Sequence, residues 1–156
     1  MRLLNKYKYY VTVAFCFGLI GLGAGLNLWF APHIDVQANP AFEHIAVRPF
    51  IKAAIDDISS FNDKYLATDG DSKIIEISGI IGEISTNMNN ETVILLNDES
   101  FKDAGVLCTL LEANNLKIPE IGSKITLKGI VRSGAEYDED LELYIDAVLE
   151  EGKILN

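Results

Sequence analysis

An uncharged apolar run near the N-terminus constrains this chain more than any other feature. From Val11 to Ala31 the sequence reads VTVAFCFGLIGLGAGLNLWFA and contains no charged side chain. A helix rises about 1.5 Å per residue, so a helix of this length reaches roughly 30 Å, the thickness of the hydrocarbon core of a bilayer. The run therefore predicts a transmembrane helix over residues 11–31, and the remainder must fold as a separate domain.

Charges on the two sides of the run predict its orientation. Three basic residues precede it, namely Arg2, Lys6 and Lys8, whereas the first charge after it is Asp35. Lys and Arg accumulate on the cytoplasmic side of membrane helices, so residues 1–10 are expected in the cytoplasm. The C-terminal domain is then periplasmic, in a single-pass inner-membrane protein.

A cleaved signal peptide is the alternative interpretation of the same run. Val36-Gln37-Ala38 offers small residues at the spacing of a cleavage site. The apolar region of a signal peptide usually has about 7–15 residues, which favours a retained signal anchor here. Both interpretations export the rest of the chain.

Small residues form one stripe of the predicted transmembrane helix. They lie at spacings of four, three and four residues: Ala14, Gly18, Gly21 and Gly25. Such a stripe lets two membrane helices approach closely, and it suggests a homodimer as a hypothesis. Glycine is also frequent in membrane helices that do not associate, so both explanations stay open.

The part of the chain after the run is strongly acidic. Residues 32–156 contain 10 basic and 23 acidic side chains, a formal charge of −13. Such a field repels polyanions and attracts cations. Only Cys108 lies in this part, so no intramolecular disulfide can stabilise it, and its apolar neighbours predict a small buried side chain.

Sequence periodicity divides the exported part into a linker, a helix and a β-domain. Residues 32–48 contain two prolines and no sustained period, which is typical of a linker. Residues 49–68 have apolar positions every three to four residues, as in an amphipathic helix. From residue 73 to 151 the period falls to two, which predicts strands.

Five strands are expected in this β-domain, and the first is bent at its glycines. Their apolar positions lie within 75–81, 93–96, 106–110, 125–131 and 141–149, and Asp98 to Gly105 is expected to connect the second strand to the third. Leu111 to Leu116 predicts a short helix between the third and fourth strands. The expected fold is mainly β: a transmembrane helix, an amphipathic helix and a five-stranded OB-fold Greek-key barrel.

The chain resembles a bacterial OB-fold family named tRNA-anti-like from about Phe50 to Leu149. Family members have a helix that ends in a tyrosine, here Tyr65, followed by a strand of the form I-x-V-x-G-x-I, here IEISGII at 75–81. The strand around Cys108, Leu116 with IGSKITLKG at 121–129, and the last strand at 143–149 also match. The DGDS turn at 69–72 departs from the family's shorter junction. The resemblance implies an OB-fold in a short, envelope-directed protein and does not imply an activity.

The sequence argues against catalysis and against nucleic-acid binding. Both histidines, His33 and His44, lie in the predicted linker, which cannot hold the geometry of a Ser/His or Cys/His pair. We therefore expect no enzyme and no cofactor. Thr92 to Asn97 and Val106 to Leu110 contain no aromatic and no basic residue, although OB-folds bind nucleic acid with such residues on these strands.

An acidic loop before the last strand is the strongest candidate for a partner contact. It comprises Glu136, Tyr137, Asp138, Glu139 and Asp140. Asp138, Asp140 and Glu142 are weak calcium candidates, because the loop lacks the spacing of an EF-hand, and a solvated acidic turn is preferred.

The leading hypothesis is a tethered binding module that contacts a basic envelope protein, a cationic peptide or a small cationic ligand. A structural subunit held in an envelope assembly by its transmembrane helix is the alternative. Nucleic-acid binding is the least favoured function, because the exported domain is acidic and the family resemblance identifies a fold rather than an activity.

Overall fold

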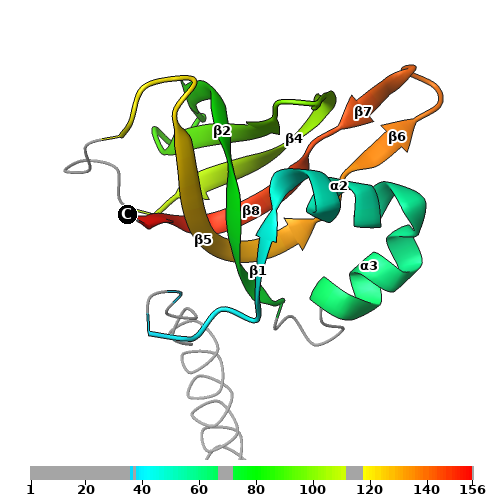
Figure 1. The fold of residues 1–156 in the computed structure, drawn as a ribbon, viewed down its shortest axis with the longest axis horizontal. Coiled ribbons are helices and arrows are strands. Elements are labelled where there is room, and N and C mark those ends of the chain that lie inside the picture. The colour runs from blue at the N-terminus through cyan, green and yellow to red at the C-terminus, as the bar shows by residue number, and fades with distance from the viewer. Residues whose placement is uncertain (1–35, 37, 67–71, 112–117, 156) are drawn as a thin grey trace, which may run out of the picture. The chain divides into compact units, whose positions relative to one another are not determined.

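A computed structural model describes residues 36, 38–66, 72–111 and 118–155, except the side chain of Lys102 (Figure 1). The described residues belong to one unit, Asp35–Asn156. The predicted transmembrane helix with its small-residue stripe, the N-terminal residues 1–10 and positions 112–116 of the predicted short helix lie outside the described residues. Within the described residues, no helix is both long enough and apolar enough to cross a membrane.

Five strands close into a barrel, as the sequence predicts. They are β2 (Ile74–Thr86), β3 (Thr92–Asp98), β4 (Phe101–Leu110), β5 (Lys124–Ser133) and β8 (Ala147–Leu155). The order is β2-β3-β4-β8-β5, and a β2–β5 pairing closes it. β4 and β8 run parallel and the other pairs are antiparallel. This closed barrel confirms the OB-like architecture.

The long first strand of the barrel pairs with two neighbours in succession. Its first half pairs with β5 and its second half with β3, and the register shifts between Ile81 and Glu83. A bulge at this point increases the local twist and turns the strand toward the second partner. The bend that the sequence predicts is therefore present.

Alternate residues of the five strands fill the barrel. Ile75, Ile77, Ile94, Leu96, Val106, Cys108, Leu127 and Leu149 are almost completely buried in one core cluster. Cys108 is one of them, as predicted, and burial raises the pKa of its thiol to about 12. A neutral, enclosed thiol behaves as a small hydrophobic side chain.

Two helices replace the single helix predicted over 49–68. They are α2 (Val47–Asp56) and α3 (Ile58–Tyr65). Asp57 between them is extended, with φ −157° and ψ 90°, and its carboxylate accepts hydrogen bonds from the backbone and hydroxyl of Ser60. An N-cap residue of this kind starts a new helix. The chain turns there, so Phe61 packs 5.1 Å from Phe50 between ring centroids.

The predicted linker is partly folded. β1 (Glu43–Ala46) pairs in parallel with β2, and α2 follows it directly. Val36 is buried, and Lys128 Nζ donates a hydrogen bond of 2.6 Å to the carbonyl of Asn39. A four-residue edge strand is too short to show a clear period, which explains why residues 36–48 are interpreted as a linker from sequence.

The last part of the β-domain also differs from the expected loop and strand. The acidic segment forms β6 (Glu136–Asp138), which pairs with β7 (Leu143–Ile145) as a separate two-stranded sheet. The final barrel strand, β8, begins at Ala147 and continues to Leu155, beyond the predicted limit at residue 151. The alternating residues 141–149 therefore divide between the hairpin and the barrel.

Candidate functional site

The β6–β7 hairpin connects the fourth and fifth strands of the barrel and projects from it beside α2 (Figure 1). The corresponding loop of OB-folds contributes to ligand binding. Glu136 lies opposite Ile145, and Asp138 lies opposite Leu143. Residues opposite each other in a two-stranded sheet share a face, so two carboxylates and two branched apolar side chains occupy one face of the hairpin.

Apolar side chains of this hairpin are exposed. Leu143 is 46% exposed, Ile145 is 38% exposed, and Leu141 near the tip is 63% exposed. Tyr137 on the opposite face is also exposed, so four of the nine exposed large apolar side chains in the described part of the chain belong to this hairpin. Such clustering on a small protein is typical of an interaction surface.

The carboxylates of the hairpin form no ion pair with the described residues. Glu136, Asp138, Glu139, Asp140 and Glu142 take part in none of the four ion pairs that the described residues form. One oxygen of Asp138 accepts the backbone N–H groups of Asp140 and Leu141 at 2.9 and 3.0 Å. Asp138 therefore shapes the turn, and the other carboxylates face solvent.

The structure does not assemble the calcium candidates into a site. Asp138 ends β6, and Asp140 and Glu142 lie in the turn that follows it, where Glu142 has a φ of 52°. No group of three or more His, Cys, Asp or Glu side chains in the described segments could hold a metal ion.

An aromatic cluster supports the other face of the hairpin. The ring of Tyr144 lies 4.9 Å from the ring of Tyr137 and 5.9 Å from the ring of Phe101. Such edge-to-face and tilted contacts stabilise a pair by about 0.5–1.5 kcal/mol beyond their burial. The base of the hairpin is thereby attached to the first residue of β4.

Phe101 is a site residue that the sequence pattern does not reveal. The pattern predicts a connection from Asp98 to Gly105, whereas β4 begins at Phe101 after a two-residue turn. A register shift between Leu96 and Asp98 interrupts the alternation there. The only local signal is Asp98-Glu99-Ser100, a combination of residues that favours a turn.

A small cleft of about 270 Å³ lies between α2 and the base of the hairpin. Ile51, Ile55, Phe101 and Tyr144 supply its apolar walls, and Arg48, Lys52 and Asp56 supply its charges. These three charged residues are spaced four apart on α2, so they form one stripe of the helix. Lys52 Nζ lies 3.0 Å from a carboxylate oxygen of Asp56.

Arg48 at the edge of the cleft is held by a chain of hydrogen bonds. Its Nη1 donates to the hydroxyl of Ser100 at 2.9 Å, and that hydroxyl donates to Asp98 at 2.6 Å. The backbone N–H of Ser100 also donates to Asp98, at 2.9 Å. The Ser100 hydrogen bonds lower the pKa of the Asp98 carboxyl, which stays ionised near neutral pH.

The outer surface of β3 and β4 differs from this cleft. Its half-buried side chains alternate with the core residues and are Val93, Leu95, Leu107 and Thr109. In the described side chains of this surface there is no ring for a base to stack on and no cation for a phosphate. The aromatic residue of β4, Phe101, instead faces the hairpin.

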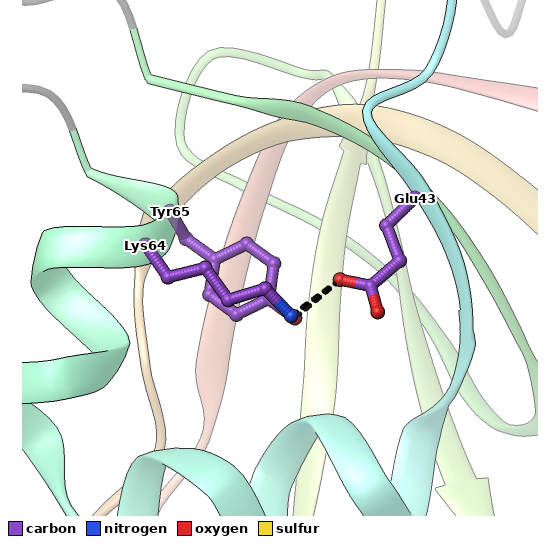
Figure 2. A network of polar contacts seen from close by, with 3 residues as sticks. All are labelled: Glu43, Lys64 and Tyr65. Atoms are coloured by element: carbon purple, nitrogen blue, oxygen red, sulfur yellow. Dashed lines mark hydrogen bonds and ion pairs between the residues drawn. The ribbon is translucent and has the colours of Figure 1, made fainter.

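A second polar cluster joins β1 to α3 (Figure 2). Glu43 Oε2 lies 2.7 Å from Lys64 Nζ and accepts the hydroxyl of buried Tyr65 at 2.8 Å. The Lys64 hydrogen bond lowers the pKa of Glu43, and the same bond raises the pKa of Lys64. Burial raises the pKa of Tyr65. This arrangement attaches the edge strand to the helix pair and has an evident structural role.

The sequence model of the tRNA_anti-like family matches residues 32–139. No curated protein matches the chain at a significant level.

A crystal structure with a similar fold comes from Klebsiella pneumoniae subsp. pneumoniae MGH 78578 and is called a "putative nucleic acid-binding lipoprotein". It shares 16% sequence identity with this chain at a TM-score of 0.52, and the similarity covers 80% of this chain and 99% of that chain. Identity at this level indicates a shared fold alone. The family model, in contrast, matches most of the 156 residues, and the chain belongs to the tRNA_anti-like family.

Proposed function

We propose that this protein is an extracytoplasmic binding module, anchored in the inner membrane by residues 11–31, whose β6–β7 hairpin binds a basic segment of an envelope protein or peptide. One observation carries the proposal. The hairpin exposes Leu141, Leu143 and Ile145 beside five carboxylates that have no cationic partner among the described residues.

The two kinds of side chain on the hairpin have different effects on binding. Apolar burial supplies affinity, at about 25 cal/mol per Å² of surface removed from water. Carboxylates select a cationic partner and increase the association rate, especially in a domain whose total charge is already −13. A segment in which lysine or arginine alternates with apolar residues is complementary to the face formed by Glu136, Asp138, Leu143 and Ile145.

Nucleic-acid binding is the rival function, because the similar Klebsiella protein is called a putative nucleic acid-binding protein. Binding to a polyanion depends on cations that displace its counterions and, for single strands, on rings that stack with bases. The described outer surface of β3 and β4 has neither, and the net charge opposes such binding. The name lipoprotein for that neighbour, together with the apolar run of this chain, supports placement at a membrane.

Charge reversal on the hairpin tests the proposed function. The ligand is a labelled peptide rich in lysine and leucine, and the protein is the full chain in detergent micelles, with protein-free micelles as the blank. Glu136→Lys with Glu139→Lys is expected to weaken binding by about tenfold or more, because close charge pairs give most of the electrostatic coupling.

A matched control separates the hairpin from the overall charge. Glu83→Lys with Glu120→Lys changes the net charge equally, and both residues are exposed outside the hairpin. We expect this control to weaken binding less than about threefold, since exposed charges further apart than about 10 Å are screened at ~0.1 M salt. Equal losses in both variants would overturn the hairpin assignment. Tight binding of a single-stranded oligonucleotide would favour the rival function.

The structural-subunit alternative is tested by replacing residues 11–31 with an unrelated transmembrane span. Peptide binding that survives the replacement supports recognition by the β-domain. A partner that is captured only with the native span would instead indicate association through the membrane helix.

A further inference from the structure

Two cations lie beside the acidic hairpin, and a basic partner of the hairpin gives them no role. Arg48 and Lys52 line the cleft next to Tyr144, and a lysine-rich segment alone would be repelled by them. We infer that this cleft binds the C-terminal carboxylate and last apolar side chain of the peptide whose basic stretch lies on the hairpin. The inference rests on the proposed function and specifies its partner as a polypeptide with a free C-terminus.

The guanidinium of Arg48 is oriented by the fold and is available to an anion. One of its N–H groups bonds to Ser100, whose hydroxyl and backbone N–H are both bound by Asp98. Arg48 forms no ion pair with a carboxylate of the described residues. Since a guanidinium has five N–H donors in a planar fork, those that remain match the two oxygens of a carboxylate.

Lys52 can turn toward the same anion at little cost. Its present partner is Asp56, and their side chains are 69% and 60% exposed. An exposed pair four residues apart in a helix contributes only about 0.3–0.5 kcal/mol, so a bound carboxylate competes readily for the ammonium. Asp56 also lines the cleft. The Ser100 hydrogen bonds and the nearby guanidinium of Arg48 lower the pKa of the Asp98 carboxyl, so the two acids nearly balance the two cations. This balance disfavours a doubly charged phosphate relative to a monoanion.

The apolar walls set the size of the group beside the carboxylate. Ile51, Ile55, Phe101 and Tyr144 enclose part of a space of about 270 Å³. Sites for free small molecules usually measure about 300–1,000 Å³, so this cleft suits a single side chain such as leucine rather than a separate ligand.

Continuity with the hairpin supports a peptide as the occupant. Tyr144 belongs to β7 and also lines the cleft. Tyr144 lies on the face of the hairpin opposite to Glu136 and Asp138, so a segment bound to those carboxylates reaches the cleft by passing over the edge of the two-stranded hairpin. Once the basic stretch is bound, entry of its end into the cleft becomes an intramolecular step at high effective concentration, which offsets the small contact area.

Two peptides that differ only at their C-terminus provide the test. Both are rich in lysine and leucine and end in leucine; one has a free carboxylate and the other a terminal amide. For the full chain in micelles we expect the free acid to bind about tenfold more tightly than the amide, as for a charge-assisted bidentate contact. In Arg48→Gln we expect this difference to disappear, and the affinity for the amide should not fall, because the variant removes a cation that repels the lysines of the peptide.

Lys124→Gln is the matched control, because Lys124 is an exposed cation on β5 that lines neither the cleft nor the hairpin. It should keep the tenfold preference for the free acid. Thermal unfolding within about 2 °C of the parent shows that Arg48→Gln is folded, since a surface change of up to about 0.5 kcal/mol shifts the midpoint by that amount.

Each outcome separates this inference from the proposed function. Equal binding of acid and amide to the parent protein overturns the inference and leaves the hairpin function intact. Failure of both peptides to bind contradicts the proposed function itself. Displacement of the free-acid peptide by a nucleoside monophosphate, through Arg48, would reassign the cleft to phosphate and also overturn the inference.

Discussion

Replacing Glu43 with glutamine removes the charge that joins β1 to the helix pair while keeping the size of the side chain. The carboxylate lies 2.7 Å from Lys64 Nζ and accepts the hydroxyl of Tyr65 at 2.8 Å (Figure 2). We expect Glu43→Gln to lower the free energy of unfolding at pH 7, because β1 is an edge strand that few other polar contacts hold against α3.

The expected loss of unfolding free energy follows from how far the side chains of Glu43 and Lys64 are exposed to solvent. The side chains of Glu43 and Lys64 are 34% and 47% exposed, so solvent screening limits their pair to about 0–1 kcal/mol. A hydrogen bond to a charged group contributes about 1.5–3 kcal/mol, and glutamine keeps a neutral acceptor for Tyr65, so roughly half of that bond is retained. The expected total is about 1–2 kcal/mol, or a fall of about 3–10 °C in Tm for a domain of this size.

The pH dependence has a definite sign. The pKa of Glu43 is lowered in the fold, so its stabilisation is present above the unfolded value, about 4.3, and is lost as pH falls through the lower folded pKa. The pKa of Lys64 is raised, so its contribution is present below about 10.4 and is lost as pH rises through the folded value. The difference between parent and variant should therefore be constant near neutral pH and shrink at both extremes.

Far-UV circular dichroism of the full chain in micelles measures this difference, by urea unfolding at pH 7 and at successively lower pH values. Glu83→Gln, an exposed carboxylate of β2 without an ion pair to a described residue, is the control and should have no effect. Equal stability of Glu43→Gln and the parent at pH 7 would refute the reasoning. A difference that persists in full below the folded pKa would show that packing, and not charge, is responsible.

Three further predictions address the core, the helix contact and the predicted transmembrane helix. In a Cys16→Ser background, Cys108 should resist iodoacetamide at pH 8 until the protein is unfolded, because burial raises its pKa to about 12; rapid native labelling would contradict its enclosure. Gly79→Ala should lower stability by about 1–3 kcal/mol, because a Cβ there would lie 2.6 Å from Val47 Cγ2; Val47→Ala should recover part of the loss, and additive losses in the double variant would refute the contact. Gly21→Ile should reduce crosslinking of a homodimer in membranes if the small-residue stripe is the contact, and an unchanged crosslink would exclude it.

Local patterns in the sequence predict the strands of the barrel, but they do not predict how the helices, the edge strand and the hairpin pack around it. Alternation at 75–81 and 125–131 identifies two central strands, since successive side chains of a strand point to opposite faces of the sheet. Periodicity also predicts one helix where the structure has α2 and α3, because the three-to-four spacing continues across Asp57. That residue ends the helix through its backbone conformation and its bonds to Ser60, which periodicity does not report.

The candidate site, too, is only partly predictable from the sequence. The acidic composition of Glu136 to Asp140 is plain from sequence, and it suggests a partner surface. Its form as a hairpin with Leu143 and Ile145 opposite two of the carboxylates depends on pairing across a turn. Phe101 and Arg48 could not be assigned to the site from sequence, because each reaches it through contacts with residues more than 40 positions away.

By itself, the sequence determined the apolar run, the acidity of residues 32–156, the absence of histidine from the barrel region and the succession of barrel strands. All of these are sums over residues or relations between near neighbours. Tertiary structure alone decided that β2 closes onto β5, that part of the expected linker belongs to the fold, and that a cleft with Arg48 and Lys52 lies beside an acidic hairpin. Closure of the barrel brings distant segments together, and the free energy that selects those neighbours is distributed over the whole core rather than encoded in any one segment.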